Sequence, residues 1–311
     1  MDVISLGETM VLFTPESSGP LRHIHRFNKT IGGAESNVCI ALSRLGHQTG
    51  WVSQLGDDEF GLYVRNIIRG EGVDTSRVAF RKDAPTAVFF KQMNHGQDPA
   101  VYYYRNNSAA RHMTPDWLDD AYLSQARFIH LTGITPALSQ SCKQTVYHII
   151  KEAHKNKQTL VFDPNIRLKL WEKAEAQSVL LDIACQCQIV MPGIEEGQLL
   201  TGKDEPEDIA TALLTGETKA VVIKLGSEGA FYATHEEHVY VKGETVSRII
   251  DTTGAGDGFA AGFLSGLIRG WDYRQAVQLG NQVGAHAITV AGDIEGYPYW
   301  SEISSDDQIL R

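Results

Sequence analysis

The 311-residue sequence has little of what would tie it to nucleic acid or to a membrane. It has 28 lysines and arginines but 38 acidic residues, so the net charge is −10, and no block of basic residues occurs. This balance argues against a nucleic-acid-binding surface, and an anionic ligand would need a local positive site. Residues 1–15 lack the charged start and long apolar core of a secretion signal. We therefore expect a cytoplasmic protein without nucleic-acid or membrane partners.

Cysteine is scarce, and one common nucleotide-binding motif is missing. Of the four cysteines, only Cys185 and Cys187 are close, and a single residue between them is too short for the usual zinc or redox spacings. Buried, reduced thiols are the simplest interpretation. No G-x-x-x-x-G-K-[ST] segment occurs, which excludes a P-loop nucleotide site.

The most informative stretch runs from Asp251 to Gly258, with the sequence DTTGAGDG. A β-type run at 239–250 precedes it, and apolar residues at helical spacing follow from 260 to 268. The first N–H groups of a helix have no intrahelical partner, and the helix dipole is positive there, so this junction predicts an anion site. Gly254 and Gly256, on either side of Ala255, leave the main chain open to a phosphate.

Asp257 would then be a carboxylate beside an anion hole, which suits phosphoryl transfer better than phosphate binding alone. It can accept a proton from a substrate hydroxyl while the N–H groups stabilise the transferring group. The helix dipole predicts that Asp257 stays ionised and is therefore a weak base. Two other interpretations are a helix-capping aspartate and a dinucleotide fingerprint, G-x-G-x-x-A, from Gly256 to Ala261. The fingerprint is disfavoured because no strand ending in an acidic residue follows about 20 residues later.

Strands and helices alternate along the second half of the chain. Strands are predicted at 127–131, 159–163, 189–191 and 220–224, with helices at 140–156, 172–184 and 276–291. This order predicts an α/β fold with a doubly wound, mostly parallel sheet flanked by helices, whose ligands lie beyond the carboxyl ends of the strands. Those ends carry Gly133, the segment 163–167, Glu195–Glu196 and the segment 224–229.

A β-hairpin is predicted earlier in the chain, with strands at 86–93 and 100–105 and a loop at 94–99. Period two places Tyr103 and Arg105 on one face and Tyr102 and Tyr104 on the other. Aromatic residues on both faces indicate either a lid between a ligand and a neighbouring chain or a well-packed flap. We expect one domain over 1–311, with lid segments at about 9–32 and 84–106 and a homo-oligomer formed through the lid.

Two motifs resemble those of ribokinase-like carbohydrate kinases, in order and separation, over essentially the whole chain: GGAESN at 32–37 and DTTGAGD at 251–257. The resemblance implies a ribokinase-like fold with a small β-flap lid. It also implies ATP as phosphoryl donor, Mg²⁺ and, as in some relatives, K⁺ near Asp251 and residues 287–292. Its anion hole would be formed by Gly254, Ala255 and Gly256, with Asp257 as the base.

The same resemblance assigns the remaining site residues. Gly33 and Asn37 would bind the sugar, and ATP would be bound by Asn165, Lys224, Gly226, Gly229, Gly254, Gly256 and Asn281. Glu196 stands where the family organises Mg²⁺ through water. Gly193, three residues earlier, replaces the asparagine usual in the family, which makes the handling of magnesium less certain than the base.

The segments YYR at 103–105, GITP at 133–136 and DPNIR at 163–167 resemble 2-keto-3-deoxygluconate kinases. That implies transfer of the ATP γ-phosphate to the terminal hydroxyl of a sugar acid. Arginine binds carboxylates bidentately, so Arg105 and Arg167, with Tyr103, are the candidates for the acidic end of the sugar. Three alternatives stay open: a kinase of the same fold for fructose, ribose or a nucleoside, a nicotinamide-dependent oxidoreductase, and a non-enzymatic sugar-responsive binding protein.

Overall fold

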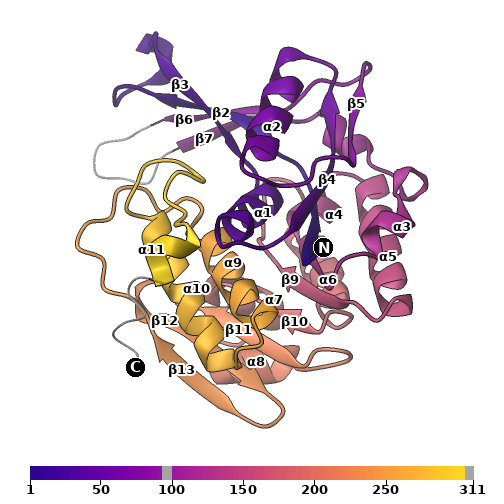
Figure 1. Cartoon of the computed structure of the whole chain (residues 1–311), viewed down its shortest axis with the longest axis vertical. Helices are drawn as coiled ribbons and strands as arrows, with labels where there is room; N and C mark the ends of the chain where they lie inside the picture. Colours follow the sequence, from indigo (N-terminus) through magenta and orange to yellow (C-terminus); the bar gives the residue numbers. More distant parts are fainter. Residues whose placement is uncertain (93–99, 305–311) are drawn as a thin grey trace.

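The computed structural model describes residues 1–92 and 100–304. Its centre is a nine-stranded sheet in the order β13-β12-β11-β10-β9-β8-β1-β4-β5, in which the seven strands from β11 to β5 are parallel and β12 and β13 are antiparallel (Figure 1). The strands are β1 (Val3–Leu6), β4 (Thr49–Gly56), β5 (Val78–Arg81), β8 (Phe128–Thr132), β9 (Thr159–Asp163), β10 (Ile189–Val190), β11 (Ala220–Lys224), β12 (Gly229–Thr234) and β13 (His238–Lys242).

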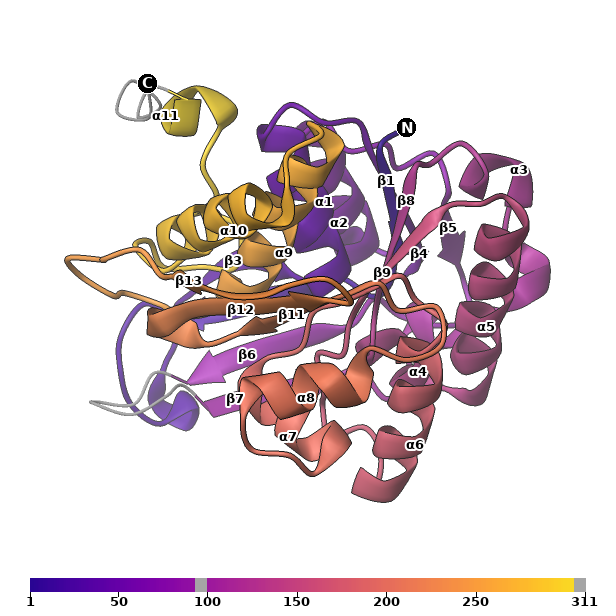
Figure 2. The ribbon, with the colours of Figure 1, turned by 90° about the horizontal axis from the view of Figure 1, so that it is seen from below.

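Helices cover both faces of this sheet, as parallel strands that are apolar on both faces require. On one face lie α1 (Ala34–Arg44), α2 (Glu59–Gly70), α9 (Ala255–Ile268) and α10 (Tyr273–Ala287); on the other lie α4 (Ile134–Leu138), α5 (Gln140–Lys155), α6 (Lys173–Ala184), α7 (Ile194–Thr201) and α8 (Pro206–Leu213) (Figure 2). Separate buried apolar clusters form on the two faces. The α/β fold expected from the sequence, with a mostly parallel sheet flanked by helices, is therefore present.

Among residues 1–92 and 100–304 there are also short helices: α3 (Asp120–Leu123) and α11 (Trp300–Ser304) are α-helices, and 3-10 turns occur at Leu21–His23, Ala109–His112, Pro115–Trp117 and Gly226–Glu228. Across residues 1–92 and 100–304, no helix combines the length and apolar character needed to cross a membrane.

A second, four-stranded sheet stands beside the large one, in the order β3-β2-β6-β7 (Figure 1). We call it the small sheet; it contains β2 (Met10–Pro15), β3 (Phe27–Gly32), β6 (Val88–Gln92) and β7 (Ala100–Tyr104). These strands fall within the two segments predicted as a lid, and the antiparallel pairing of β6 with β7 confirms the two hairpin strands. The predicted loop at 94–99 lies outside the described residues.

Two elements depart from their predicted bounds by three or more residues. The β-type run was expected to continue to residue 250, but β13 ends at Lys242 and residues 243–254 form neither helix nor strand. The reason is that its partner β12 begins at Gly229, opposite Lys242, so no strand is available further on. The last long helix is α10, which starts three residues earlier than predicted and ends at Ala287 rather than 291. It starts there because the Asp272 side chain caps the helix by accepting a hydrogen bond from the Gln275 N–H.

Candidate active site

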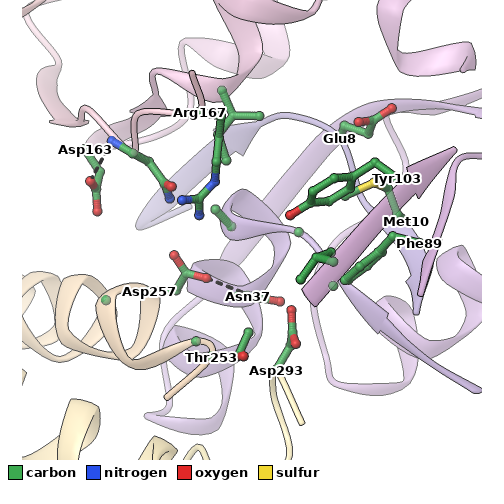
Figure 3. Close-up of a pocket in the computed structure, with 18 of the residues that line it drawn as sticks. Glu8, Met10, Asn37, Phe89, Tyr103, Asp163, Arg167, Thr253, Asp257 and Asp293 are labelled. Carbon is green, nitrogen blue, oxygen red and sulfur yellow. Dashed lines mark hydrogen bonds between the residues drawn. The ribbon is translucent and has the colours of Figure 1, made fainter. Parts of the chain in front are cut away.

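The carboxyl ends of the parallel strands, the start of α9 and the small sheet enclose a cavity of about 310 Å³ (Figure 3). It is lined by most of the predicted catalytic and sugar-binding residues together with several others: Glu8, Gly33, Asn37, Lys91, Tyr103, Arg105, Asp163, Asn165, Arg167, Glu196, Lys224, Gly254, Gly256, Asp257 and Asp293. Residues from both ends of the chain are thus brought into one site.

A second cavity, of about 670 Å³, adjoins the first at the start of α9, because Lys224 and Gly256 line both. Its lining includes the predicted nucleotide residues Gly226, Gly229 and Asn281, as well as Ala255 and an apolar set formed by Val246, Ile249, Phe259 and Ile288. Asn165, which was also predicted to bind ATP, lines the first cavity instead. The two cavities meet where the sequence predicts phosphoryl transfer.

The anion-hole turn depends on Gly254. This residue precedes α9 with φ +79°, in the left-handed region that favours glycine. A Cβ atom here would lie 2.3 Å from the backbone oxygen of Asp293, so a side chain has no room. The Tyr297 hydroxyl donates a 2.9 Å hydrogen bond to the Gly254 carbonyl and holds the turn from behind. The first hydrogen bond of the helix, Gly258 N–H to Gly254 O, spans 2.8 Å, so the N–H groups of residues 255–257 have no partner within the helix.

Asp257 lies in the first turn of α9 with its carboxylate toward the cavity (Figure 3). Burial raises its pKa to about 7, and the charge of Asp163 acts in the same direction. The Asn37 hydrogen bond and the positive charges of Lys224 and Arg167 lower the pKa, but by less than burial raises it. The prediction of an ionised, weak base is therefore wrong, because desolvation by burial raises the pKa of Asp257.

Asn37 positions this carboxylate from the first turn of α1. Its side-chain amide donates a 2.8 Å hydrogen bond to Asp257 Oδ2. Its own Oδ1 is buried and has no hydrogen-bond partner among the described residues. A buried acceptor without a partner carries an energetic cost, which a ligand hydroxyl in the cavity would remove.

Acidic and basic groups also meet at the ends of β9 and β11. The Lys224 ammonium lies 2.6 Å from Asp163 Oδ2. Glu196 accepts 2.8 Å hydrogen bonds from the backbone N–H groups of Ile166 and Gly193, and burial raises its pKa. Gly193, where the family usually has asparagine, therefore contacts Glu196 through its main chain.

The donor set at this edge of the sheet fits an indirectly held magnesium ion. Within the described ranges, no three or more histidine, cysteine, aspartate or glutamate side chains are arranged to bind a metal directly. Mg²⁺ in nucleotide sites keeps several waters and takes only one or two carboxylates besides the phosphates. Asp163 and Glu196, which both line the cavity, match that need.

The two candidate carboxylate-binding arginines have different surroundings. Arg105 is buried and forms an ion pair with Glu8, and its guanidinium lies 5.5 Å from the Tyr103 ring centroid. Arg167 is exposed, and its side chain extends into the cavity between Asp257 and Tyr103 (Figure 3). In the part of the chain that the structure describes, Arg167 forms no ion pair.

Among the charged residues of the cavity, Glu8, Lys91 and Asp293 were not predicted from the sequence. Lys91 was detectable as a charged residue at an inward position of strand β6, whose first three residues are apolar, and Asp293 as a polar residue after a glycine. Lys91 Nζ lies 3.2 Å from Asp251 Oδ2, the carboxylate expected near a potassium ion. Glu8 follows the first strand, but nothing in the sequence indicates its pairing with Arg105.

The dinucleotide interpretation of Gly256 to Ala261 is not supported by the local structure. In that fingerprint a strand leads directly into the glycine turn. Here the irregular segment 243–254 separates β13 from α9, and α9 is itself followed by α10 rather than by another strand.

Comparison with known proteins agrees with this geometry. Residues 1–300 match the model of the pfkB family carbohydrate kinases. The chain is 40% identical to 2-dehydro-3-deoxygluconokinase of Bacillus subtilis (strain 168), over 98% of this chain and 95% of that protein. It is 33% identical to probable fructokinase-4 of Arabidopsis thaliana, over 97% and 95% of the two chains.

One solved structure carries ligands of the expected kind. A protein from E. coli, provisionally named ribokinase II and solved in complex with ATP and Mg²⁺, has a TM-score of 0.92 with this chain at 26% identity, with 99% of each chain covered. The resemblance expected from the two sequence motifs is thus confirmed across almost the full length. The chain belongs to the pfkB family of carbohydrate kinases.

Proposed function

We propose that this enzyme transfers the γ-phosphate of ATP to the terminal hydroxyl of 2-keto-3-deoxygluconate, giving the 6-phosphate. One observation carries the substrate assignment: Asp257, Arg105 and Arg167 line the same cavity. A sugar acid can place its carboxylate at the two arginines while its terminal hydroxyl reaches Asp257. The 40% identity to a 2-dehydro-3-deoxygluconokinase supports the same substrate.

In the reaction, Asp257 accepts the proton of the substrate hydroxyl while the hydroxyl oxygen bonds to the γ-phosphorus, the bond from that phosphorus to the bridging oxygen breaks, and ADP leaves. Its raised pKa, about 7, makes it a stronger base than an ordinary aspartate while leaving about half of it ionised at neutral pH. Asn37 keeps the carboxylate oriented, and its free Oδ1 accepts a hydrogen bond from another sugar hydroxyl. Gly33, at the N-cap of α1, lines the same cavity and binds the sugar beside Asn37 in this proposal.

The phosphate chain of ATP lies at the junction of the two cavities. Backbone N–H groups of the 254–256 turn stabilise the charge on the transferring group, and Lys224 binds the phosphates next to them. The second cavity receives the nucleoside, with Gly226 and Gly229 along the main chain, Asn281 toward the base and an apolar wall for its ring. Asn165 contributes from the sugar side.

Mg²⁺ supplies neutralisation of phosphate charge when it is bound. Asp163 and Glu196 would hold it through water, since both line the cavity and neither belongs to a direct metal cluster among the described residues. The K⁺ that the resemblance implies is not part of this proposal, because Lys91 already places a positive charge at Asp251.

The small sheet acts as the lid over the sugar and excludes water that would hydrolyse ATP. Its inward face carries Phe89 and Tyr103, stacked at 5.6 Å between ring centroids. Its outward face leaves Tyr102 and Tyr104 exposed by 46% and 66%. These tyrosines support an oligomer in which two copies of the chain meet through their small sheets. Because ATP is its phosphoryl donor, we place the enzyme in the cytoplasm.

A coupled ADP-release assay with ATP, Mg²⁺ and a panel of sugars tests the substrate. The panel contains 2-keto-3-deoxygluconate, 2-ketogluconate, fructose, ribose and adenosine. We expect turnover of 2-keto-3-deoxygluconate to exceed the others in kcat/KM. The 33% identity to a probable fructokinase makes fructose the second candidate, and a higher kcat/KM for fructose would contradict the sugar-acid assignment while keeping the kinase.

A further inference from the structure

A buried lysine connects the small sheet to the anion-hole turn. Lys91 lies on β6, where period two turns it inward, and its side chain is only 3% exposed. Its ammonium lies 3.2 Å from Asp251 Oδ2, 2.9 Å from Thr253 Oγ1 and 3.1 Å from Asp293 Oδ1. All three partners belong to the segments that form and support the start of α9, and Thr253 and Asp293 lie at one side of the cavity (Figure 3).

The surroundings keep Lys91 positively charged. Burial acts to lower its pKa, but the charges and hydrogen bonds of Asp293 and Asp251 outweigh burial, and the pKa is raised. A buried ammonium is expensive unless it is paired and its donors are satisfied. Here three acceptors match the three N–H bonds of an ammonium, so the group is fully paired.

The partners of Lys91 hold the turn before Gly254 in a closed ring. Asp251 Oδ1 accepts from both the backbone N–H of Thr253, at 3.0 Å, and its hydroxyl, at 2.6 Å. Asp251 Oδ2 accepts from the Gly292 N–H at 3.3 Å as well as from Lys91. The Lys91 ammonium therefore closes a ring of hydrogen bonds with Asp251 and Thr253. Gly254 follows directly after this ring in the sequence.

Asp293 extends this connection to both sides of the site. Its backbone oxygen packs so closely against Gly254 that a Cβ there would lie 2.3 Å away. Its carboxylate packs equally closely under Gly32, at the end of β3, where a Cβ would lie 2.4 Å from Oδ2. A shift of the small sheet that moves Lys91 thus moves the groups on which the anion hole rests.

We propose that Lys91 is a positioning residue that supplies a built-in cation: when the small sheet is closed, its ammonium fixes the 251–254 turn in the shape that binds the transferring phosphoryl group. This rests on the proposed phosphoryl transfer but not on the identity of the sugar. The ammonium sits against the carboxylate at which a free monovalent cation was expected. The enzyme therefore needs no K⁺, because Lys91 on strand β6 supplies the positive charge at this position.

The test measures kcat, both KM values and salt dependence for the wild-type chain, Lys91→Met, Lys91→Ala and the control Lys29→Met. Lys29 is an exposed lysine on β3 of the same sheet. We expect wild-type rates to be equal in potassium, sodium and tetramethylammonium chloride at one ionic strength. Lys91→Met should lower kcat about 10- to 100-fold with the KM for ATP changed less than about threefold, since misplacement of reacting groups acts on the chemical step. Lys29→Met should match the wild type.

Lys91→Ala leaves space for a small cation, so ammonium or K⁺ should restore at least about a tenth of the wild-type kcat, whereas tetramethylammonium should not. Rescue that depends on ion size separates positioning by charge from loss of packing. A wild-type enzyme that requires K⁺ would overturn the proposal, as would full kcat in Lys91→Met or loss without any rescue in Lys91→Ala. Should another sugar be the substrate, the same measurements are made with that sugar and only the substrate assignment fails.

Discussion

The Asn37 amide donates a 2.8 Å hydrogen bond to Asp257 Oδ2, across 220 residues of sequence. This contact joins the first turns of α1 and α9, the two glycine-preceded helices that carry the family motifs. It also opposes the burial that raises the pKa of Asp257. Orientation and basicity of the proposed base therefore depend on the same side chain.

The raised pKa of Asp257 predicts an acid limb in the pH profile. A base must be ionised to accept a proton, and this carboxyl has a pKa of about 7 in the folded enzyme. We expect kcat/KM to be constant well above pH 7 and to fall about tenfold per unit well below it. Initial rates from pH 5 to 9, in buffers of constant ionic strength, check this. An acid limb near pH 4 would show that the carboxylate is not desolvated.

Removing Asn37 should move that limb. In Asn37→Ala the hydrogen bond that favours the ionised carboxylate is lost, so the pKa of Asp257 rises and less base is available at neutral pH. A hydrogen bond to a charged group contributes about 1.5–3 kcal/mol, which corresponds to an upward shift of about one to two pH units. The readout is the pH midpoint of kcat/KM, with the exposed Asn66→Ala as a control that should leave it unchanged. An unmoved midpoint in Asn37→Ala contradicts the link.

Asp257→Asn should remove the base while preserving the shape of the site. General-base catalysis contributes about 10²- to 10⁴-fold, so kcat should fall by that amount. The affinity for ATP should stay within about twofold or rise slightly, because a negative charge near the phosphates is lost. Stopped-time assays and equilibrium binding of a nonhydrolysable ATP analogue measure the two quantities. Turnover within about threefold of the wild type would reassign the base.

Arg167→Ala should discriminate between acidic and neutral sugars. The guanidinium reaches into the cavity without an ion-pair partner among residues 1–92 and 100–304, so it is free to bind a carboxylate. We expect the KM for 2-keto-3-deoxygluconate to rise about 10- to 100-fold, as the loss of a charged hydrogen-bonding pair implies. The KM for a neutral sugar such as fructose should change less than about threefold. Arg69→Ala, an exposed arginine of α2 remote from the cavity, is the matched control. Equal rises for both sugars would remove the carboxylate role.

Local patterns predicted the parts of this site that depend on neighbours in sequence. A glycine turn followed by helical periodicity located the 254–257 segment, and strand ends located Arg167 and Lys224, whereas Gly33 and Asn37 came from the family motif. The pairings of Glu8 with Arg105 and of Lys91 with Asp293 join residues about 100 and 200 positions apart, so no local pattern contains them. The pKa of Asp257 was misjudged for a related reason: the helix dipole is visible in the sequence, whereas burial by other segments is not.

The same distinction between local conformation and tertiary contact can be measured at Gly254. Gly254→Ala places a Cβ at φ +79°, which costs about 1–2 kcal/mol, and in addition forces it against the Asp293 oxygen at 2.3 Å. Gly270, just past the other end of α9, has φ +80° with nothing within 4 Å of its Cβ position, so Gly270→Ala carries the strain without the clash.

We therefore expect Gly270→Ala to lose about 1–2 kcal/mol of unfolding free energy and to keep wild-type kcat. Gly254→Ala should lose more stability than its control and at least about 100-fold in kcat, because the Cβ displaces either Asp293 or the N–H groups of the turn. Chemical denaturation and steady-state rates measure the pair. If the two variants lost equal stability and Gly254→Ala kept its kcat, the turn would tolerate displacement, and the close packing of Asp293 against Gly254 would have no part in forming the anion hole.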